Sequence, residues 1–120
     1  MKNEEYDLRA RTKAFALRVI KMFCALTKST EAQVLGKQVL RSGTSVGANC
    51  REAHRARSKA EFISKMGDSL KELEETSYWL DLLAESDIVK PSKLASLMDE
   101  TSQLTAIFIT IINNSKRNRP

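Results

Sequence analysis

A run of small and polar residues with helical spacing constrains the fold of this chain more than any other feature. It covers residues 38–52 and reads QVLRSGTSVGANCRE. At 100° per residue, the glycines of this region share one stripe of a helix, next to an apolar stripe that contains Val39 and Val46. The glycine stripe consists of Gly36, Gly43 and Gly47. Because each glycine costs about 1 kcal/mol relative to alanine inside a helix, this stripe predicts close approach of another backbone, in a tight bundle or a subunit contact.

Apolar residues recur at steps of three and four along four segments, as is typical of amphipathic helices. The segments cover residues 4–28, 31–57, 59–85 and 91–114. Ser58 with Glu61 resembles a capping box for the third helix. Thr30 with Gln33 resembles a weaker box for the second, and Pro91 suits the first turn of the fourth. Since the connections are short, we expect an all-α fold, an antiparallel up-down-up-down four-helix bundle that forms a single domain over residues 1–120.

The third segment has the clearest coiled-coil-like seam. Its predicted core positions are Ile63, Met66, Leu70, Leu73, Ser77, Leu80 and Ala84. The fourth segment has a similar seam that ends at Phe108 and Ile111, within an apolar run at residues 106–112. That run is apolar nearly all round, which is more surface than one bundle core absorbs. With the glycine stripe it predicts self-association; the alternative is that Ile107 and Ile109 are half-exposed at the bundle edge.

Composition excludes several classes of protein. The chain has only two prolines and four glycines in 120 residues, which favours helices. Cys24 and Cys50 have no CxxC spacing and predict reduced, buried side chains of a cytosolic protein rather than a disulfide framework. The N-terminal residues lack the apolar core of a signal peptide, and no apolar run reaches membrane-spanning length. We expect a soluble, cytoplasmic protein that does not associate with a membrane.

Two polar motifs stand in the middle of the chain. An Arg-Ser-x-x-Ser-x-x-x-Asn-x-x-Glu pattern and a Glu-x-x-Glu-x-x-x-Trp pattern are formed by Arg41, Ser42, Ser45, Asn49, Glu52, Glu72, Glu75 and Trp79. With these motifs and Phe62 between them, the chain resembles the four-helix-bundle family that includes proteins encoded in intervening sequences of bacterial 23S ribosomal RNA genes. Ala53 departs from the pattern of many relatives, which have glycine after the glutamate.

The resemblance implies a homo-oligomer of bacterial origin, a ring of five bundles, with no known catalysis. It also implies kinship with the accessory proteins of diversity-generating retroelements. Those are basic bundles of the same shape that associate with nucleic acid and a reverse transcriptase. Neither role follows from the periodicity of this chain, and most members of the family have no assigned activity.

Positive charge is concentrated in the first half of the chain. Residues 1–60 carry 13 Lys and Arg against 5 Asp and Glu, a net charge of +8, whereas residues 61–120 carry 7 against 10, a net charge of −3. A basic face on the first two helices would suit the phosphate backbone of RNA or DNA, bound without reading of the bases. The predicted phosphate contacts are Arg11, Arg18, Lys21, Arg41, Arg51, Arg55 and Arg57.

Two alternatives to that basic face stay open. The basic helices could pair with the acidic ones, and the excess charge would then only solubilise the protein. Arg41 in particular could form a structural ion pair with Glu52 or with an acid of the third helix. The same basic face could also dock an acidic or nucleic-acid-handling protein.

The sequence contains few candidate catalytic residues. His54 is the single histidine, which disfavours a Ser-His triad, and no Glu-x-x-His pair exists for a di-iron site. Glu52, Glu72 and Glu75 could converge between the second and third helices, but without two imidazoles we expect no metal there. We expect Asn49 and Glu52 to hydrogen-bond to a facing helix instead. The prediction is a non-enzymatic, oligomeric binding module for RNA or DNA with no cofactor; the alternative is a scaffold that docks a partner such as a reverse transcriptase.

Overall fold

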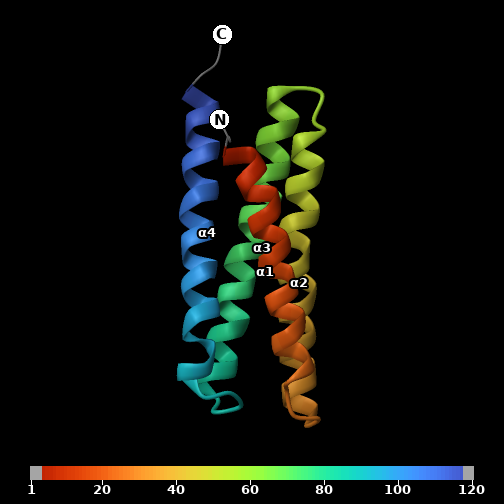
Figure 1. Ribbon diagram of the computed structural model, residues 1–120, viewed down its shortest axis with the longest axis vertical. Coiled ribbons are helices and arrows are strands. Elements are labelled where there is room, and N and C mark those ends of the chain that lie inside the picture. The colour runs from red at the N-terminus through yellow and green to blue at the C-terminus, as the bar shows by residue number, and fades with distance from the viewer. Residues whose placement is uncertain (1–3, 118–120) are drawn as a thin grey trace.

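Four long helices make up the part of the chain that the structure describes. A computed structural model describes residues 4–117, with side chains for residues 8–117. The helices are α1 (Glu4–Cys24), α2 (Thr30–His54), α3 (Lys59–Glu85) and α4 (Pro91–Arg117). Successive helices run in opposite directions, and the described residues contain no strand (Figure 1). The prediction of an all-α, antiparallel four-helix bundle is confirmed.

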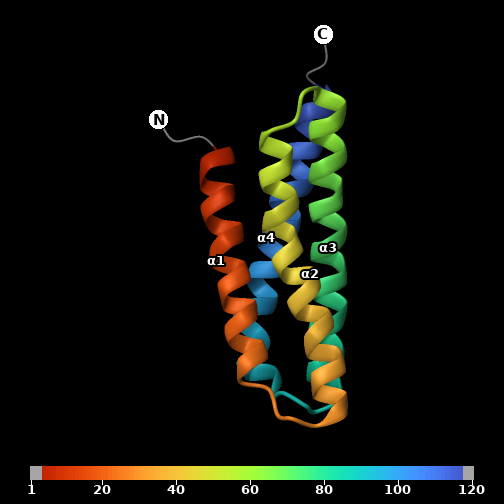
Figure 2. The same ribbon diagram turned by 90° about the vertical axis from the view of Figure 1, so that its right-hand side faces the viewer.

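The loops divide the bundle into two different ends. The α1–α2 and α3–α4 loops lie together at the lower end in Figure 2. The α2–α3 loop lies at the upper end, beside the first turn of α1 and the last turn of α4. Residues on α1 and α4 that are far apart in the sequence are therefore spatial neighbours.

Serine side chains set the starts of α2 and α3. The Ser29 hydroxyl accepts a hydrogen bond from the backbone N–H of Ala32 at 3.2 Å, and the Ser58 hydroxyl accepts from that of Glu61 at 3.0 Å. Each serine satisfies one N–H group that has no partner within its helix. The Ser58 cap agrees with the predicted box, whereas α2 is capped by Ser29 rather than Thr30.

Three helices differ in length from their predicted segments. α2 begins at Thr30 and ends at His54, three residues before its predicted end at residue 57. α1 ends at Cys24, about four residues early, because the N–H groups of Ala25 and Leu26 turn back to carbonyl groups three residues before them. α4 continues to Arg117, three residues beyond its predicted end. These differences fall where the sequence offers no glycine or proline to mark the boundary.

The seam of α3 lies in a different register from the predicted one. Ile63 and Leu70 are only half-buried, and Ser77 is exposed. The side chains that alternate at steps of three and four along the buried face are Met66, Ser69, Leu73, Thr76, Leu80 and Leu83. Only part of the predicted seam therefore faces the core.

Two small hydroxyl residues explain this register. The Ser69 hydroxyl donates a hydrogen bond to the carbonyl oxygen of Val46 at 2.8 Å. The Ser42 and Thr76 hydroxyl oxygens lie 2.7 Å apart in a buried hydrogen bond. Small side chains let α2 and α3 approach closely, and every buried hydroxyl among these finds a partner.

The glycine stripe of α2 faces α1. A Cβ atom placed on Gly43 would lie 2.8 Å from Cγ2 of Val19, and one on Gly47 would lie 3.3 Å from Oγ1 of Thr12. The first distance is shorter than packed carbon atoms tolerate, so the glycine lets α1 lie directly on α2. The predicted close approach thus occurs within one chain. The stripe is buried and offers no surface to another subunit.

α1 is packed unevenly between its two neighbours. It lies along α2 over much of its length but contacts α4 at few places and stands at the outside of the bundle in Figure 2. Polar side chains, described below, span the seam between α1 and α4. Within the described residues, no helix has a stretch that is long and apolar enough to cross a lipid bilayer.

Candidate nucleic-acid interface

The seven predicted phosphate contacts do not form one continuous face. Arg11 and Arg18 point toward α4, and Arg41 points toward α3. The remaining arginines lie at the upper end, where α2 finishes. The seven cations therefore divide into groups with different surroundings.

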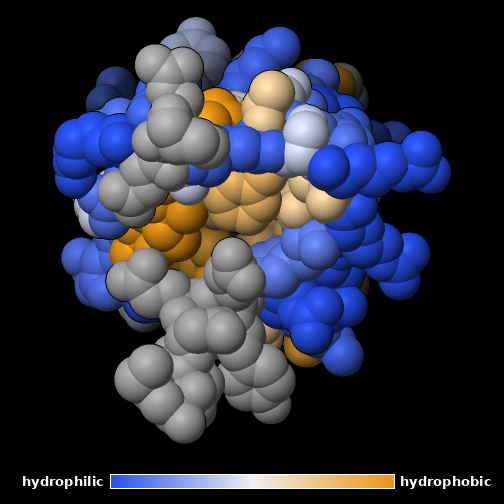
Figure 3. Space-filling model, turned by 90° about the horizontal axis from the view of Figure 1, so that it is seen from above, coloured by the Kyte–Doolittle hydropathy of each residue, from blue (hydrophilic) through white to orange (hydrophobic). Residues whose placement is uncertain are grey.

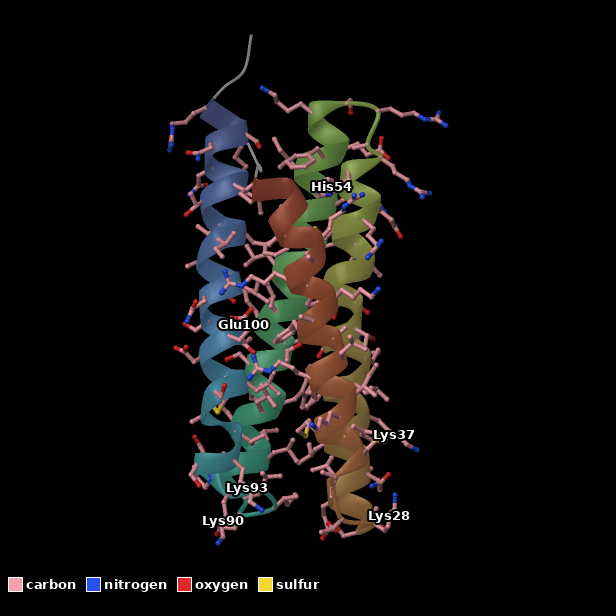
Figure 4. The ribbon with its side chains drawn as sticks, viewed as in Figure 1. Lys28, Lys37, His54, Lys90, Lys93 and Glu100 are labelled. Carbon is pink, nitrogen blue, oxygen red and sulfur yellow. The ribbon has the colours of Figure 1, made fainter. Side chains whose placement is uncertain are left out.

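Arg11 forms an ion pair across the seam between α1 and α4. Its Nε donates to Oε2 of Glu100 at 2.8 Å, and its Nη2 donates to Oε1 of the same carboxylate at 2.9 Å and to Gln103 Oε1 at 2.9 Å. Glu100, labelled in Figure 4, is half-buried on α4. The hydrogen bonds raise the pKa of Arg11 and lower the pKa of Glu100. The charge of Arg11 is largely neutralised within the chain.

Arg41 forms a second interhelical ion pair, between α2 and α3. Its Nη2 donates to Glu75 Oε1 at 2.6 Å, and its Nη1 donates to Glu72 Oε1 at 3.3 Å. The hydrogen bond to Glu75 is the main cause that raises the pKa of Arg41. This geometry matches the alternative of a structural ion pair with acids of the third helix. Its part in binding phosphate stays a prediction.

Arg18 and Lys21 lie on the α4 side of α1, near the lower end of the bundle. The Nη2 of Arg18 donates to the neutral Ser96 hydroxyl at 2.8 Å, and Arg18 forms no ion pair within residues 8–117. Both side chains border a pocket between α1 and α4. Val19, which lies between them in the sequence, packs against Gly43 in the middle of α2, whereas the other arginines lie where α2 ends.

The arginine end of the bundle, which we define as Arg51, Arg55 and Arg57, contains the most available of the predicted cations. All three side chains are exposed, and none forms a hydrogen bond or ion pair within residues 8–117. Figure 4 shows nitrogen-tipped side chains that extend outward around the α2–α3 loop, above His54. Figure 3 views the same end directly and shows hydrophilic side chains around an apolar centre.

The carboxylates near the arginine end already have partners. Glu52 pairs with Lys65 at 2.8 Å, and this hydrogen bond raises the pKa of Lys65. Glu61 accepts from the backbone N–H of Arg57 at 3.0 Å. A shallow hollow of about 420 Å³ lies between these side chains. Positive charge therefore predominates at the outer surface here.

Two further cations of α1 belong to the same end of the molecule. Arg9 and Lys13 are exposed, and they flank Thr12, which lies against Gly47 of α2. Because α1 and α2 are antiparallel, Arg9 is level with the last turns of α2, near Arg51. The sequence indicated these two residues only through the positive net charge of residues 1–60. That net charge does not distinguish exposed, unpaired cations from cations that form ion pairs.

The polar motif residues of α2 and α3 mostly have structural contacts. Ser42 bonds to Thr76, and the Ser45 hydroxyl donates to the Arg41 carbonyl oxygen at 2.7 Å. Asn49 is half-buried and has no side-chain hydrogen bond among residues 8–117, contrary to the expected contact with a facing helix. Likewise Trp79 Nε1 is buried without a partner in that range.

The three carboxylates considered as metal ligands do not converge. Glu72 and Glu75 bind Arg41, whereas Glu52 binds Lys65. Within the described residues, no group of three or more His, Cys, Asp or Glu side chains could hold a metal ion. These acids act as ion-pair partners that connect α2 to α3.

The exposure of one cysteine differs from the predicted burial, and part of the apolar run in α4 is exposed. Cys24 is exposed rather than buried, because α1 ends there. Cys50 is buried as predicted, and neither cysteine forms a disulfide within the described residues. In the apolar run of α4, Ile112 is buried and Ile111 is half-buried, whereas Ile109 is 41% exposed. Ala106, Ile109 and Thr110 of that run are exposed, and Ile107 is half-buried, which agrees with the alternative that Ile107 and Ile109 lie half-exposed at the bundle edge.

Comparison with known proteins agrees with this architecture. The family model of the 23S rRNA-intervening sequence protein matches residues 4–110. The chain belongs to this family. The prediction made from the polar motifs is therefore confirmed. Among curated proteins, none matches the chain.

A solved structure supports the same family assignment. It is a crystal structure of a protein of unknown function from the S23 ribosomal protein family of Bacteroides thetaiotaomicron VPI-5482. It has a TM-score of 0.87 and 35% sequence identity, and the alignment covers 92% of this chain and 99% of that chain. The fold that the two chains share is a helical bundle.

Proposed function

We propose that this protein is a non-enzymatic, homo-oligomeric bundle that binds the phosphate backbone of RNA or DNA through its arginine end. The observation that carries the proposal is the exposure of Arg51, Arg55 and Arg57, whose guanidinium groups form no ion pair among residues 8–117. Guanidinium groups bind phosphate oxygens through paired N–H donors. Arg9 and Lys13 extend the positive surface along α1.

Backbone-directed contact fits the side chains at this end better than base recognition. Of the aromatic residues with described side chains, only Tyr78 is exposed, and its ring lies edge-on to Trp79 at a centroid distance of 5.1 Å. Proteins that stack bases need exposed aromatic faces in or beside a basic groove. Contacts to phosphate alone give binding that is strongly salt-dependent and tolerant of sequence.

Self-association is supported by apolar side chains on the outer surface. Leu17 is 57% exposed and Ile20 is 40% exposed on α1, and Val34 is 56% exposed on α2. Exposed apolar side chains on the outer surface favour contact with protein rather than water. A ring of five chains, as the resemblance implies, would repeat the arginine end five times and raise the affinity for a long polyanion.

The test is binding of labelled single- and double-stranded RNA and DNA across a salt series, with absolute mass measured on the same sample. A variant in which Arg51, Arg55 and Arg57 are all changed to Gln is compared with a matched variant in which Lys28, Lys37 and Lys71 are changed to Gln. These lysines are exposed and lie outside the arginine end. Both variants lose three charges.

We expect the arginine variant to bind more than tenfold more weakly at low salt. Its plot of log affinity against log salt should be shallower, by roughly 0.9 for each phosphate of double-stranded DNA that the variant no longer neutralises. The affinity of the lysine variant should stay within about threefold of that of wild type. Its small decrease reflects the loss of net positive charge, which both variants share. Equal losses in the two variants, or no binding by wild type at low salt, would exclude the arginine end as a nucleic-acid site.

The exposed apolar face of α1 also favours a second candidate, a protein-interaction scaffold that docks a nucleic-acid-handling partner. The same salt series separates the two. A nucleic-acid-binding protein binds RNA or DNA of any sequence at low salt. A scaffold instead binds one protein partner, and changing Leu17 and Ile20 to Glu abolishes that binding. That double change should leave the arginine end unaffected.

A further inference from the structure

A pocket of about 620 Å³ opens between α1 and α4 at the lower end of the bundle, away from the arginine end. It lies between the last turns of α1, the α3–α4 loop and the first two turns of α4. Small-molecule sites occupy roughly 300–1,000 Å³ and often lie between helices of bundles. The pocket therefore has the volume of a ligand site.

The early end of α1 creates this space. After Cys24 the chain turns toward α2, where Leu26 packs directly over Gly36. Leu26 therefore packs against α2, and it also forms part of the pocket lining. On the opposite side, Asp87 adopts a left-handed conformation (φ 64°), and the N–H of Ile88 returns to the Leu83 carbonyl oxygen at 3.2 Å. The two chain reversals stand on either side of the opening.

The walls of the pocket are apolar and its rim is cationic. The apolar lining includes Met22, Leu26, Ile88, Val89, Leu94 and Leu97. Arg18 and Lys21 border it on the α1 side, and Lys90 and Lys93 border it on the α4 side. No carboxylate lines the pocket.

The cations of the rim form no ion pair within the described part of the chain. Lys21, Lys90 and Lys93 are exposed and have no ion-pair partner among residues 8–117. Arg18 donates only to the neutral hydroxyl of Ser96. Asp99, the first carboxylate along α4 beyond the pocket, accepts a hydrogen bond from Gln103 Nε2 at 2.7 Å, and Glu100, the next one, binds Arg11. Four like charges around one opening produce a positive potential that attracts anions.

We infer that this pocket binds a small anionic amphiphile, with the apolar body between α1 and α4 and a phosphate-like head at the rim. An apolar lining selects the body by removing it from water, and the lysines select the sign of the head. The site is independent of the proposed nucleic-acid surface at the other end of the bundle.

A protein segment fits the pocket less well than a small molecule. The lining residues come from three short segments, whereas a standard protein interface takes about 20–30 residues from each side. The exposed apolar residues of α1, which would extend such an interface, are on its outer face and do not line the pocket. The chemistry of the rim and its limited extent together favour a compact ligand.

The experiment is calorimetric titration of the full chain with decyl phosphate below its micelle-forming concentration. Inorganic phosphate and 1-decanol serve as probes that carry only the head or only the body. We expect saturable binding of one decyl phosphate per chain, with each partial probe at least tenfold weaker. Equal affinity for inorganic phosphate or for 1-decanol would overturn the proposal, as would the absence of saturable binding.

Matched charge reversals locate the site. Figure 4 places Lys90 and Lys93 on one side of the lower end and Lys28 and Lys37 on the other. Changing Lys90 and Lys93 to Glu should weaken decyl phosphate at least tenfold, whereas changing Lys28 and Lys37 to Glu should have less than a threefold effect. Because all four side chains are exposed, neither variant removes core packing. Equal effects of the two variants would contradict a pocket at this position.

A blocking variant tests the apolar part. Ala25 is exposed and lines the opening, so Ala25→Trp places a large ring there without changing the core. We expect this variant to keep its helical content and to lose decyl phosphate binding. Unchanged binding in the folded variant would overturn the proposal. A changed oligomer mass together with no binding by wild type would assign the pocket to a second copy of the chain instead.

Discussion

The two neighbours of α1 hold it in opposite ways. Against α2, the contact depends on shape, because glycines remove the side chains that would separate the helices. Against α4, the contact depends on charge, because Arg11 reaches Glu100 across a seam with few other contacts. One helix thus has a sterically fixed interface and an electrostatic one. The bundle is therefore rigid where α1 packs on α2, and it can admit a ligand between α1 and α4.

The largest expected effect concerns the shape-dependent interface. Gly43→Ala adds a Cβ 2.8 Å from a methyl group of Val19, which is fully buried and has a stiff, branched side chain. Overpacking of this kind costs about 1–3 kcal/mol, and it opposes a gain of about 1 kcal/mol in helix propensity. We expect a net decrease in the free energy of unfolding by urea.

The matched control for that change is Gly67→Ala in α3. A Cβ at Gly67 meets no atom within 4 Å, so only the helix propensity should act. This variant is expected to be stabilised by about 0.5–1 kcal/mol. If both alanine variants were stabilised, the close approach of α1 to α2 would not depend on the glycine at position 43.

The electrostatic interface is tested by a double-mutant cycle on Arg11 and Glu100. Arg11→Met and Glu100→Gln remove a two-point ion pair whose side chains are 35% and 17% exposed. We expect a coupling energy of about 1 kcal/mol, above the median for a fully exposed pair because the geometry is bidentate. High salt should reduce this coupling and leave the effect of Gly43→Ala unchanged. A coupling near zero at low salt would mean that α4 does not hold α1 through this pair.

The same pair gives the α1–α4 seam a dependence on pH. Hydrogen bonding to Arg11 lowers the pKa of Glu100 below its ordinary value of 4.5, so the ionised form stabilises the folded state. This contribution is complete above the unfolded pKa and is lost as the pH falls through the lower folded pKa. The difference in free energy of unfolding between wild type and Glu100→Gln should therefore be constant at neutral pH and shrink in acid. If the difference in free energy of unfolding grew as the pH fell, the pKa of Glu100 would be raised by folding rather than lowered.

The fold class followed from the sequence because it depends on local spacing. Four amphipathic segments with short connections allow few arrangements other than an antiparallel bundle. The Ser58 cap and the position of Pro91 followed from local chemistry as well. The glycine stripe predicted close approach, although spacing alone did not distinguish α1 of the same chain from another subunit.

The register of α3 and the partners of the arginines did not follow from the sequence. Ser69 and Thr76 are buried because their hydroxyl groups hydrogen-bond to α2. The spacing of apolar residues at steps of three and four instead predicts Leu70 and Ser77 in the core. Arginine is long and flexible, so its position on a helix does not determine which neighbouring helix it reaches. Net charge therefore predicted the basic half of the chain but not that Arg11 has an acidic partner. For Arg41 the sequence left open an ion pair with an acid of the third helix, and the structure shows that pair with Glu72 and Glu75.

The smallest expected effect tests whether the seam is open near the pocket. Ser96→Ala removes the hydroxyl that accepts from Arg18, the hydrogen bond between α1 and α4 nearest to the lower end. Because both side chains are exposed, water can replace the missing hydroxyl, and we expect a change below about 0.5 kcal/mol in the free energy of unfolding. The same change frees the Arg18 guanidinium and should leave decyl phosphate binding equal or tighter. A decrease above about 1 kcal/mol would show that this hydrogen bond holds α1 to α4 as firmly as Glu100 does, and the two ends of the seam would then not differ.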